Sequence, residues 1–328
     1  MYTGGFRKKV YNTPVGDVEV GDSFDMEEAV DLFTDAYMYD DWSKRTLKFH
    51  LENLAAFKKF LLTRQKGARV SSRLLGDFIG EMRKNGRKLN TINGRIKTLR
   101  VFFRVLCEKE YIGKNPAENL RTIKGAGSEI IPFSQEQVKA LLAAPDKNTF
   151  VGLRDYMIML ILLDTGVRLD ELVHVRPSDI SLNSKSIFIR SGKGKKSRTV
   201  YFGAETRKAI QKYLKYIGIR DEERPLLLNQ DGQPLRPRTI QERIAEYAKN
   251  AQIKGVRCSP HTFRHTFSKM FLMGGGDPYV LRDLLGHSTM STVITYIKLF
   301  REDLQKKYRG NSPVDKLRTG SRDDGSRD

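Results

Sequence analysis

Cysteine is scarce in this sequence, and long hydrophobic runs are missing. The 328 residues include two cysteines, Cys107 and Cys258, and neither has another cysteine nearby. This spacing excludes a disulfide framework and a cysteine-ligated metal site, and it fits a reducing cytoplasm. No apolar run approaches membrane-spanning length, and the amino terminus lacks a signal-peptide pattern, so we expect neither a membrane protein nor a secreted one.

Acidic residues are also under-represented. The chain carries 39 Asp and Glu against 59 Lys and Arg, which gives a formal net charge of +20, and its sequence pI is about 9.8. An excess of this size predicts a polyanionic partner, and nucleic acid fits better than a membrane surface. With 39% hydrophobic residues the chain can still bury two cores. We therefore expect a cytoplasmic protein that binds nucleic acid.

Changes in composition and periodicity divide the chain into five segments. Residues 1–22 mix basic, Gly, Pro and small polar residues, which predicts a flexible arm, and residues 310–328 have the composition of a disordered tail. Apolar residues recur at helical spacing throughout residues 23–118, which predicts a four-helix bundle. The Gly- and Ser-containing stretch 119–132 is typical of an interdomain linker. Residues 133–309 alternate helical patterns with two short strands, so the fold class is mainly α with a small β-sheet.

One helix of the bundle has a polar, mostly basic face beside its apolar stripe. The residues of this face are Asn93, Lys97, Arg100 and Arg104. Such a face can lie along DNA phosphates or enter a groove. The alternative is a merely soluble surface. The charge of the whole chain favours DNA binding.

Two further basic features occur in the second domain. A strongly apolar helix ends at Gly166, so Arg168 lies on the turn before the next helix and has a rigid mount. Farther on, residues 186–189 and 198–202 have the pattern of two strands joined by a basic turn. The basic residues of this hairpin are Lys193, Lys195, Lys196 and Arg198. We expect Lys195, Lys196 and Arg198 to contact DNA. A lysine at an exposed tip can reach a bound ligand, or it can make a simple electrostatic contact; spacing does not distinguish them.

The stretch from Ser259 to Lys298 carries most of the chemically active side chains. Ser259 is a good helix N-cap and Pro260 suits the first helical position, so His261 and Arg264 share a face of the helix that follows. A second short helix ends before His287, and a third carries Tyr296. Arginine offers a permanent charge to phosphate oxygens, histidine moves protons near neutral pH, and tyrosine can be a covalent nucleophile. The combination predicts phosphate chemistry.

Simpler interpretations of these residues exist. A His-x-x-Arg pair occurs often by chance, and a tyrosine on an amphipathic helix is commonly a half-buried aromatic. His261 and His265 are four residues apart, as in zinc-binding helices, but Thr262 stands where a metalloprotease motif needs glutamate. We expect no metal site. The functional interpretation therefore depends on the order and spacing of residues along the whole chain.

That order resembles the tyrosine recombinase family, the phage-integrase and Xer-like site-specific recombinases. The resemblance covers residues 24–300. Five motifs support the resemblance. The first two are Thr-Gly-Val-Arg-Leu-Asp-Glu-Leu, which includes Arg168, and the Gly-Lys-Gly tip, which includes Lys193. The others are His-Thr-Phe-Arg-His-Thr-Phe from His261, Leu-Leu-Gly-His ending at His287, and Tyr296 nine residues later. Phe263 replaces the more usual leucine inside His-x-x-Arg. The resemblance implies a four-helix, SAM-like core-binding domain followed by an α+β catalytic domain.

The family's chemistry implies a role for each matching residue. Tyr296 attacks a phosphodiester and leaves a 3′-phosphotyrosyl link and a free 5′-hydroxyl. Lys193 protonates the departing oxygen. Arg168 and Arg264 neutralise the pentavalent phosphorane, His261 helps to take the tyrosine proton, His287 hydrogen-bonds the phosphate, and Glu171 supports the site from behind. His265 lies one turn past His261 and could face the phosphate too, but we expect it to pack against or orient its neighbours. No metal, ATP or other cofactor is needed.

The resemblance also implies the assembly and its biological setting. The helix of residues 300–309 docks on a neighbouring subunit, which makes the working unit a homotetramer on two DNA sites, with a Holliday junction as intermediate. It further implies a bacterial, nucleoid-associated enzyme that acts on double-stranded DNA at specific recombination sites. We expect a recombinase that moves a mobile element and works with accessory proteins. The alternatives are an Xer-type resolvase of chromosome or plasmid dimers, a topoisomerase with the same tyrosine chemistry, and a non-catalytic DNA-binding protein.

Overall fold

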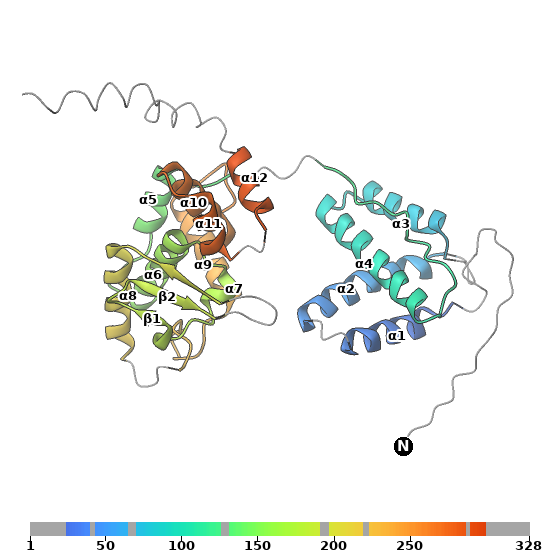
Figure 1. Ribbon diagram of the computed structural model, residues 1–328, viewed down its shortest axis with the longest axis horizontal. Coiled ribbons are helices and arrows are strands. Elements are labelled where there is room, and N and C mark those ends of the chain that lie inside the picture. Colours follow the sequence, from blue (N-terminus) through green and yellow to red (C-terminus); the bar gives the residue numbers. More distant parts are fainter. Residues whose placement is uncertain are drawn as a thin grey trace, which may run out of the picture. The chain divides into compact units, whose positions relative to one another are not determined.

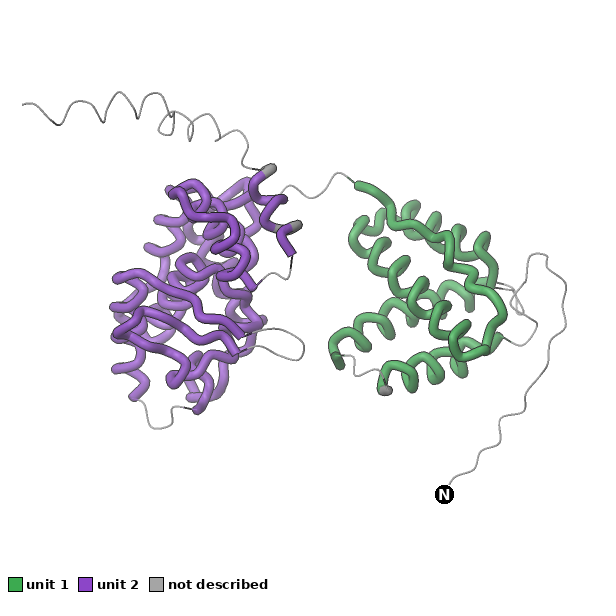
Figure 2. Tube along the Cα trace, in the orientation of Figure 1, with its two compact units in different colours: residues 1–127 green, residues 128–328 purple. Residues whose placement is uncertain are grey.

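The computed structural model describes residues 24–39, 43–64, 70–125, 131–190, 197–218, 223–286 and 289–299. These residues are mostly helical, with one three-stranded sheet (Figure 1), which confirms the predicted fold class. The chain divides into two compact units, Met1–Gly127 and Ser128–Asp328 (Figure 2). The division falls inside the predicted linker; the other segment boundaries stay predictions. The predicted arm, the tail and the helix at 300–309 lie outside the described residues.

The described residues of the N-terminal unit form four helices. They are α1 (Met26–Tyr39), α2 (Lys44–Leu62), α3 (Ser72–Lys84) and α4 (Leu89–Glu108). Ser43 and Ser71 begin α2 and α3, and the side chain of each accepts a hydrogen bond from a backbone N–H in the first turn. α4 contacts the other three helices, and its Phe102 and Phe103 are fully buried in an aromatic core. α4 is therefore held firmly along its apolar side, and its other side is left to solvent.

The C-terminal unit is built around α6 (Phe150–Thr165). This helix is buried on nearly every side, as its sequence predicts, and it contacts α5 (Gln135–Ala143), α8 (Ala204–Ile217), α9 (Pro237–Asn250) and α10 (Pro260–Met273). A helix that is apolar all round must be enclosed. Because α6 is enclosed, the turn that follows it, with Arg168, is attached directly to the buried core of the unit.

Two charged residues nevertheless lie inside this core, on α6. Arg154 and Asp155 are both buried, with Arg154 Nη2 2.7 Å from Asp155 Oδ1. Asp155 also accepts hydrogen bonds from Arg243 Nε at 2.8 Å and from Tyr247 Oη at 2.9 Å, both on α9. Buried charges are tolerated when they are paired and hydrogen-bonded. This network ties α9 to α6 in a way that apolar periodicity does not reveal.

The sheet is an antiparallel arrangement of β1 (Ile180–Ser181), β2 (Ser186–Ile189) and β3 (Arg198–Tyr201), preceded by a short 3-10 helix, η1 (Pro177–Asp179). Ile187 pairs with Val200 and both are buried, whereas Phe188 faces solvent. This alternation is typical of a sheet with one covered face. The predicted hairpin is confirmed, and Arg198 stands at the start of β3, where the chain returns from the hairpin tip.

No helix in the described ranges combines the length and the apolar character that crossing a bilayer requires.

Candidate active site

Three helices near the carboxyl end of the chain bring the predicted site residues together. They are α10, α11 (Pro278–Leu285) and α12 (Ser291–Leu299), and they share a small apolar cluster of their own that includes Phe267, Leu285 and Tyr296. Ser259 caps α10 and Pro260 is its first residue, as predicted. Asp277 caps α11 by accepting hydrogen bonds from the backbone N–H groups of Tyr279 and Val280.

Arg264 lies at the centre of this group and is 5% exposed. Its Nη1 donates to the carbonyl oxygen of Gly166 at 2.7 Å, and its Nη2 donates to the carbonyl oxygen of Leu285 at 2.8 Å. Burial, and then the charge of Arg168, lower the pKa of Arg264 to about 10. At neutral pH the guanidinium therefore still carries its charge, in a place where that charge is weakly screened.

Gly166 allows this close packing. It ends α6 in the left-handed conformation, with φ of 61°. A Cβ atom at this position would lie 2.3 Å from the ring of Phe267 on α10. Only glycine combines this backbone conformation with so close a neighbour.

Arg168 and Glu171 form the second part of the site, at the start of α7 (Leu169–Leu172). Glu171 accepts hydrogen bonds from the backbone N–H of Arg168 at 2.9 Å and from its Nη1 at 3.0 Å. Arg168 Nη1 also lies 3.4 Å from the carbonyl oxygen of Leu285. Burial raises the pKa of Glu171, but the hydrogen bonds from Arg198 and Arg168 outweigh it and bring that pKa to about 2. Glu171 is therefore a carboxylate at any physiological pH.

Arg198 is the third arginine of the cluster. Its side chain is 12% exposed, and its Nη1 and Nη2 reach the two oxygens of Glu171 at 3.1 and 2.7 Å. Its Nε donates to the carbonyl oxygen of Leu284 at 2.7 Å. The sequence suggests Arg198 as a DNA contact; in the structure its guanidinium faces into the protein.

The end of α11 is the common anchor of these arginines. The carbonyl groups of Leu284 and Leu285 belong to the last turn, where helical carbonyls lack partners within the helix and carry the negative end of the helix dipole. Arg168, Arg198 and Arg264 each donate to one of them. A single helix end thus holds three cations together against their mutual repulsion.

Tyr296 reaches the same place from α12. It is 3% exposed, and its Oη lies 2.9 Å from Nδ1 of His265. Burial raises the pKa of Tyr296, and the charge of Arg264 and a hydrogen bond from Ser268 offset only part of that rise. The phenol is therefore protonated at neutral pH, and it needs a group that takes its proton before or during any attack.

Among the described residues, His265 is positioned to take the proton of the Tyr296 phenol. Burial, and then the neighbouring His261 and Arg264, lower the pKa of His265 to about 4. The imidazole is consequently neutral at physiological pH, and in the tautomer protonated on Nε2 its Nδ1 accepts the phenol hydrogen. The prediction from sequence was that His261 takes the tyrosine proton and that His265 has only a supporting role. In the structure His261 is exposed on the first turn of α10.

Several predicted site residues cannot be placed. Lys193, Lys195, Lys196 and His287 lie outside the described residues, so their roles stay predictions. Within the described ranges, no three His, Cys, Asp or Glu side chains come together as a metal site.

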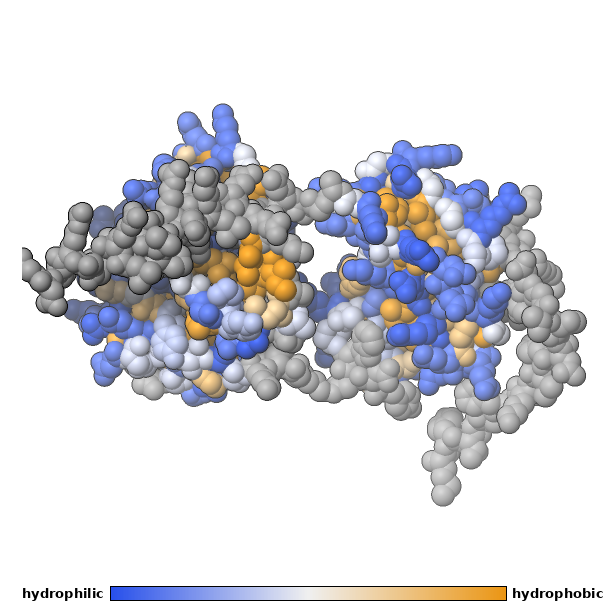
Figure 3. Space-filling view, turned by 45° about the horizontal axis from the view of Figure 1, so that its top comes forward, coloured by the Kyte–Doolittle hydropathy of each residue, from blue (hydrophilic) through white to orange (hydrophobic). Residues whose placement is uncertain are grey.

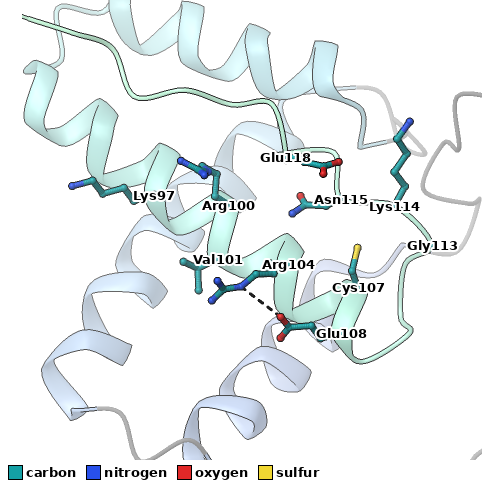
Figure 4. Close-up of a pocket in the computed structure, with 10 residues that line it drawn as sticks. All are labelled: Lys97, Arg100, Val101, Arg104, Cys107, Glu108, Gly113, Lys114, Asn115 and Glu118. Carbon is teal, nitrogen blue, oxygen red and sulfur yellow. Dashed lines mark ion pairs between the residues drawn. The ribbon is translucent and has the colours of Figure 1, made fainter. Parts of the chain in front are cut away.

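The basic face predicted on α4 lines a groove of about 760 Å³ in the N-terminal unit (Figure 4). Lys97, Arg100 and Arg104 point from α4, and the opposite wall is the segment 113–118. Arg104 also lies 3.7 Å from Glu108 of the same helix. Asn93 differs from the other three, because its amide exchanges two hydrogen bonds with the backbone of Ile123, at 2.8 and 3.0 Å. The groove is thus a cationic surface with only two carboxylates, Glu108 and Glu118, in its lining.

Comparison with known proteins gives a consistent result. The phage integrase family matches residues 132–302. Tyrosine recombinase XerC of Thermodesulfovibrio yellowstonii is 30% identical over 281 residues, which cover 84% of this chain and 92% of that protein. XerC of Staphylococcus carnosus is 31% identical over 283 residues, which cover 83% of this chain and 92% of that protein. The structure of the Tn1549 transposon integrase in complex with a circular intermediate DNA aligns with a TM-score of 0.67 at 18% identity, covering 85% of this chain and 99% of that one.

Proposed function

Because this chain belongs to the phage integrase family of tyrosine recombinases, we propose that it is a site-specific integrase that cuts and rejoins DNA for a mobile genetic element. As a tyrosine recombinase it cleaves and rejoins DNA through a tyrosine intermediate, without metal or ATP. The observation that supports the strand-cleavage chemistry of this proposal is the position of the Tyr296 phenol, which is held by His265 within the field of Arg264 and Arg168.

In the proposed cleavage step, Tyr296 Oη attacks the phosphorus of one phosphodiester. The phenol O–H bond breaks and its proton goes to His265 Nδ1, while the bond from phosphorus to the 5′-oxygen breaks and Lys193 supplies the proton for that oxygen. Religation is the reverse, with a 5′-hydroxyl as nucleophile. The phosphotyrosyl ester conserves the bond energy, which is why no nucleotide cofactor is consumed.

The arginines stabilise the charge that develops on phosphorus. Arg264 and Arg168 are fixed by carbonyl groups and by Glu171 before substrate arrives, so they need little reorganisation as the phosphorane forms. Arg168 is the more open of the two, with 28% of its side chain exposed. We propose that both contact non-bridging oxygens, and that His261 and His287 complete the phosphate-binding surface.

A nicked suicide substrate tests this proposal. The DNA should come from the regions that flank the gene, with a nick placed so that the short strand released by cleavage diffuses away and religation stops. We expect a covalent protein–DNA band that forms equally well in EDTA, with the tryptic peptide containing Tyr296 attached to a 3′-phosphate. Failure of the chain to form any adduct on DNA that it binds specifically would favour a non-catalytic DNA-binding protein.

His265→Gln is expected to slow cleavage by about 100-fold, because glutamine can hold the phenol by a hydrogen bond but cannot take its proton. The pH dependence of stability should change as well. The pKa of His265 is lowered from 6.5 to about 4 in the fold, so its neutral form stabilises the protein above pH 6.5, and that stability is lost as pH falls toward 4. Thermal unfolding of His265→Gln should therefore depend less on pH in this window. A large loss of cleavage in His261→Gln with normal cleavage in His265→Gln would instead favour His261.

The groove beside α4 is the proposed DNA surface of the N-terminal unit. Replacing both Lys97 and Arg100 with alanine should weaken DNA binding and make the plot of log K against log salt shallower by about 2, since each phosphate contact contributes a slope of about 0.9. Lys58→Ala is a matched control, because Lys58 is a basic residue of the same unit that is ion-paired with Glu27 on another face. An unchanged salt slope in the double variant would show that DNA binds elsewhere.

Assembly into a tetramer on two DNA sites is part of the proposal. Figure 3 shows hydrophobic side chains gathered on an exposed area of the C-terminal unit. Large apolar residues of α11 and α12 are exposed, with Tyr279 at 61% and Ile294 at 43%. Surface patches of this kind often mark protein–protein contacts. Exchange of the helix at 300–309 between subunits, and accessory proteins that set direction, are expected to accompany this contact.

A second candidate is resolution of chromosome or plasmid dimers, which the XerC relatives support by their identity over most of both chains. The two functions differ in their DNA. An integrase should recombine sites at the ends of its own element, whereas a dimer resolvase should act on a single chromosomal or plasmid site present in every cell. Comparing adduct formation on these two classes of substrate distinguishes them.

A further inference from the structure

Arg198 makes more contacts inside the cluster than its place on an exposed hairpin suggests. All three nitrogens of its guanidinium donate to the protein: two to the carboxylate of Glu171 and one to the carbonyl of Leu284. The arrangement with Glu171 is the paired, two-bond geometry that arginine alone among the side chains can make. With 12% of its side chain exposed and its guanidinium directed at Glu171 and Leu284, Arg198 is held by the protein and is not presented as a surface cation.

The first consequence of this pairing concerns charge. Glu171 is a buried carboxylate beside Arg168, the more open of the arginines proposed to bind phosphate. An unneutralised carboxylate there would compete with the DNA phosphate for Arg168 and repel the phosphorane. Arg198 takes both oxygens of Glu171, so the cluster of Arg168, Arg198, Arg264 and Glu171 keeps a net positive charge.

The second consequence concerns position. Arg198 is the first residue of β3, and it is the described residue of that strand nearest to the hairpin tip that carries Lys193. Its guanidinium also packs against Gly286, where a Cβ would lie 2.8 Å from Nη1. Gly286 adopts φ of 64° and precedes His287. One side chain thereby connects the base of the hairpin, the start of α7 and the end of α11.

We propose that Arg198 is a positioning residue for strand cleavage. It neutralises the charge of Glu171, so that Arg168 keeps a net attraction for the scissile phosphate while still hydrogen-bonded to Glu171, and it holds the base of the hairpin against the end of α11. This inference rests on the proposed recombinase function. The family resemblance assigns no role to this arginine, and the sequence pattern predicts that Arg198 contacts DNA instead.

The test compares single-turnover cleavage of the suicide substrate at saturating DNA. Arg198→Ala should cleave about 10- to 100-fold more slowly than the wild type, with unchanged DNA affinity and an unchanged salt slope. Arg198→Lys should be nearly as slow, because an ammonium cannot occupy both oxygens and the Leu284 carbonyl together. Adding Glu171→Gln to Arg198→Ala should restore cleavage several-fold, since a neutral amide does not compete for Arg168. A purely structural role predicts no such rescue.

Arg190→Ala provides the matched control. Arg190 is another hairpin arginine in an ion pair, with its Nε 2.7 Å from Asp179 Oδ1, but it lies outside the cluster. We expect its cleavage to match the wild type. Thermal unfolding of every variant identifies any that is unfolded, and Arg198→Lys then serves in place of Arg198→Ala.

Three results would overturn the inference: wild-type cleavage by Arg198→Ala, a salt slope reduced by about 1 with normal cleavage at saturation, or slow cleavage that Glu171→Gln does not relieve. Failure of the proposed function itself would look different, because the wild-type protein would then form no adduct.

Discussion

Tyr296→Phe is expected to abolish covalent attachment to DNA, with a loss of at least about 1,000-fold in adduct formation, while specific DNA binding remains. The change removes one oxygen atom, the proposed nucleophile. The ring itself packs in the apolar cluster of α10, α11 and α12, so the fold should be retained. The measurement is denaturing electrophoresis of the suicide-substrate reaction, with DNA binding followed separately by mobility shift.

Stability gives an independent check on this variant. His265 loses its partner, and a buried polar group left without a hydrogen bond costs about 1–3 kcal/mol. Tyr216→Phe is the matched control, because Tyr216 is an exposed tyrosine on α8, and it should form adduct normally. Adduct formation by Tyr296→Phe at the wild-type rate would remove Tyr296 from the chemistry altogether.

The second large effect is expected at Arg264. Arg264→Lys should reduce cleavage by about 100- to 1,000-fold at saturating DNA, the range found when one preorganised donor to a developing negative charge is lost. A lysine keeps the charge, but it cannot donate in fixed directions to the carbonyl groups of Gly166 and Leu285 and also to a phosphate oxygen. Single-turnover rates would measure the loss, and affinity for DNA should change little, since most of the binding charge lies elsewhere.

Arg257→Lys controls for the general effect of the substitution. Arg257 is an exposed arginine just before α10, and its replacement should leave the rate unchanged. Wild-type cleavage by Arg264→Lys would mean that only the charge of this residue matters. In that case the anchoring by carbonyl groups would have no catalytic role.

Much of the fold followed from local patterns. The cap at Ser259 falls where a capping residue precedes an apolar period, and the hairpin pattern matches β2 and β3. Each of these features depends on contacts between residues a few positions apart. A buried network such as that of Asp155 with Arg243 and Tyr247 has no such local signature, because its members are 88 and 92 residues apart in the chain.

The same limit applies to the site, where the sequence identifies residues but not the contacts that they make. Sequence order alone selected Arg168, Glu171, Arg264 and Tyr296, and the structure brings all four together. It also selected Arg198, but as a DNA contact, since a basic residue next to a basic turn has the pattern of a surface cation. The contacts with Glu171 and Leu284 arise only when α7 and α11 pack on the hairpin. Asn93 is a similar case, because its polar position on α4 gave no sign of the returning segment at Ile123.

The sequence by itself determined the mainly helical class, the basic character, the family and the set of residue types that can act on a phosphate. Those properties depend on composition, on periodicities of two or 3.6 residues and on short motifs, which need no knowledge of tertiary packing. Only the tertiary structure decided which of two histidines, His261 or His265, meets the phenol of Tyr296. Both histidines lie on one face of α10, and the choice between them depends on where α12 crosses that face, which is set by side-chain packing between helices.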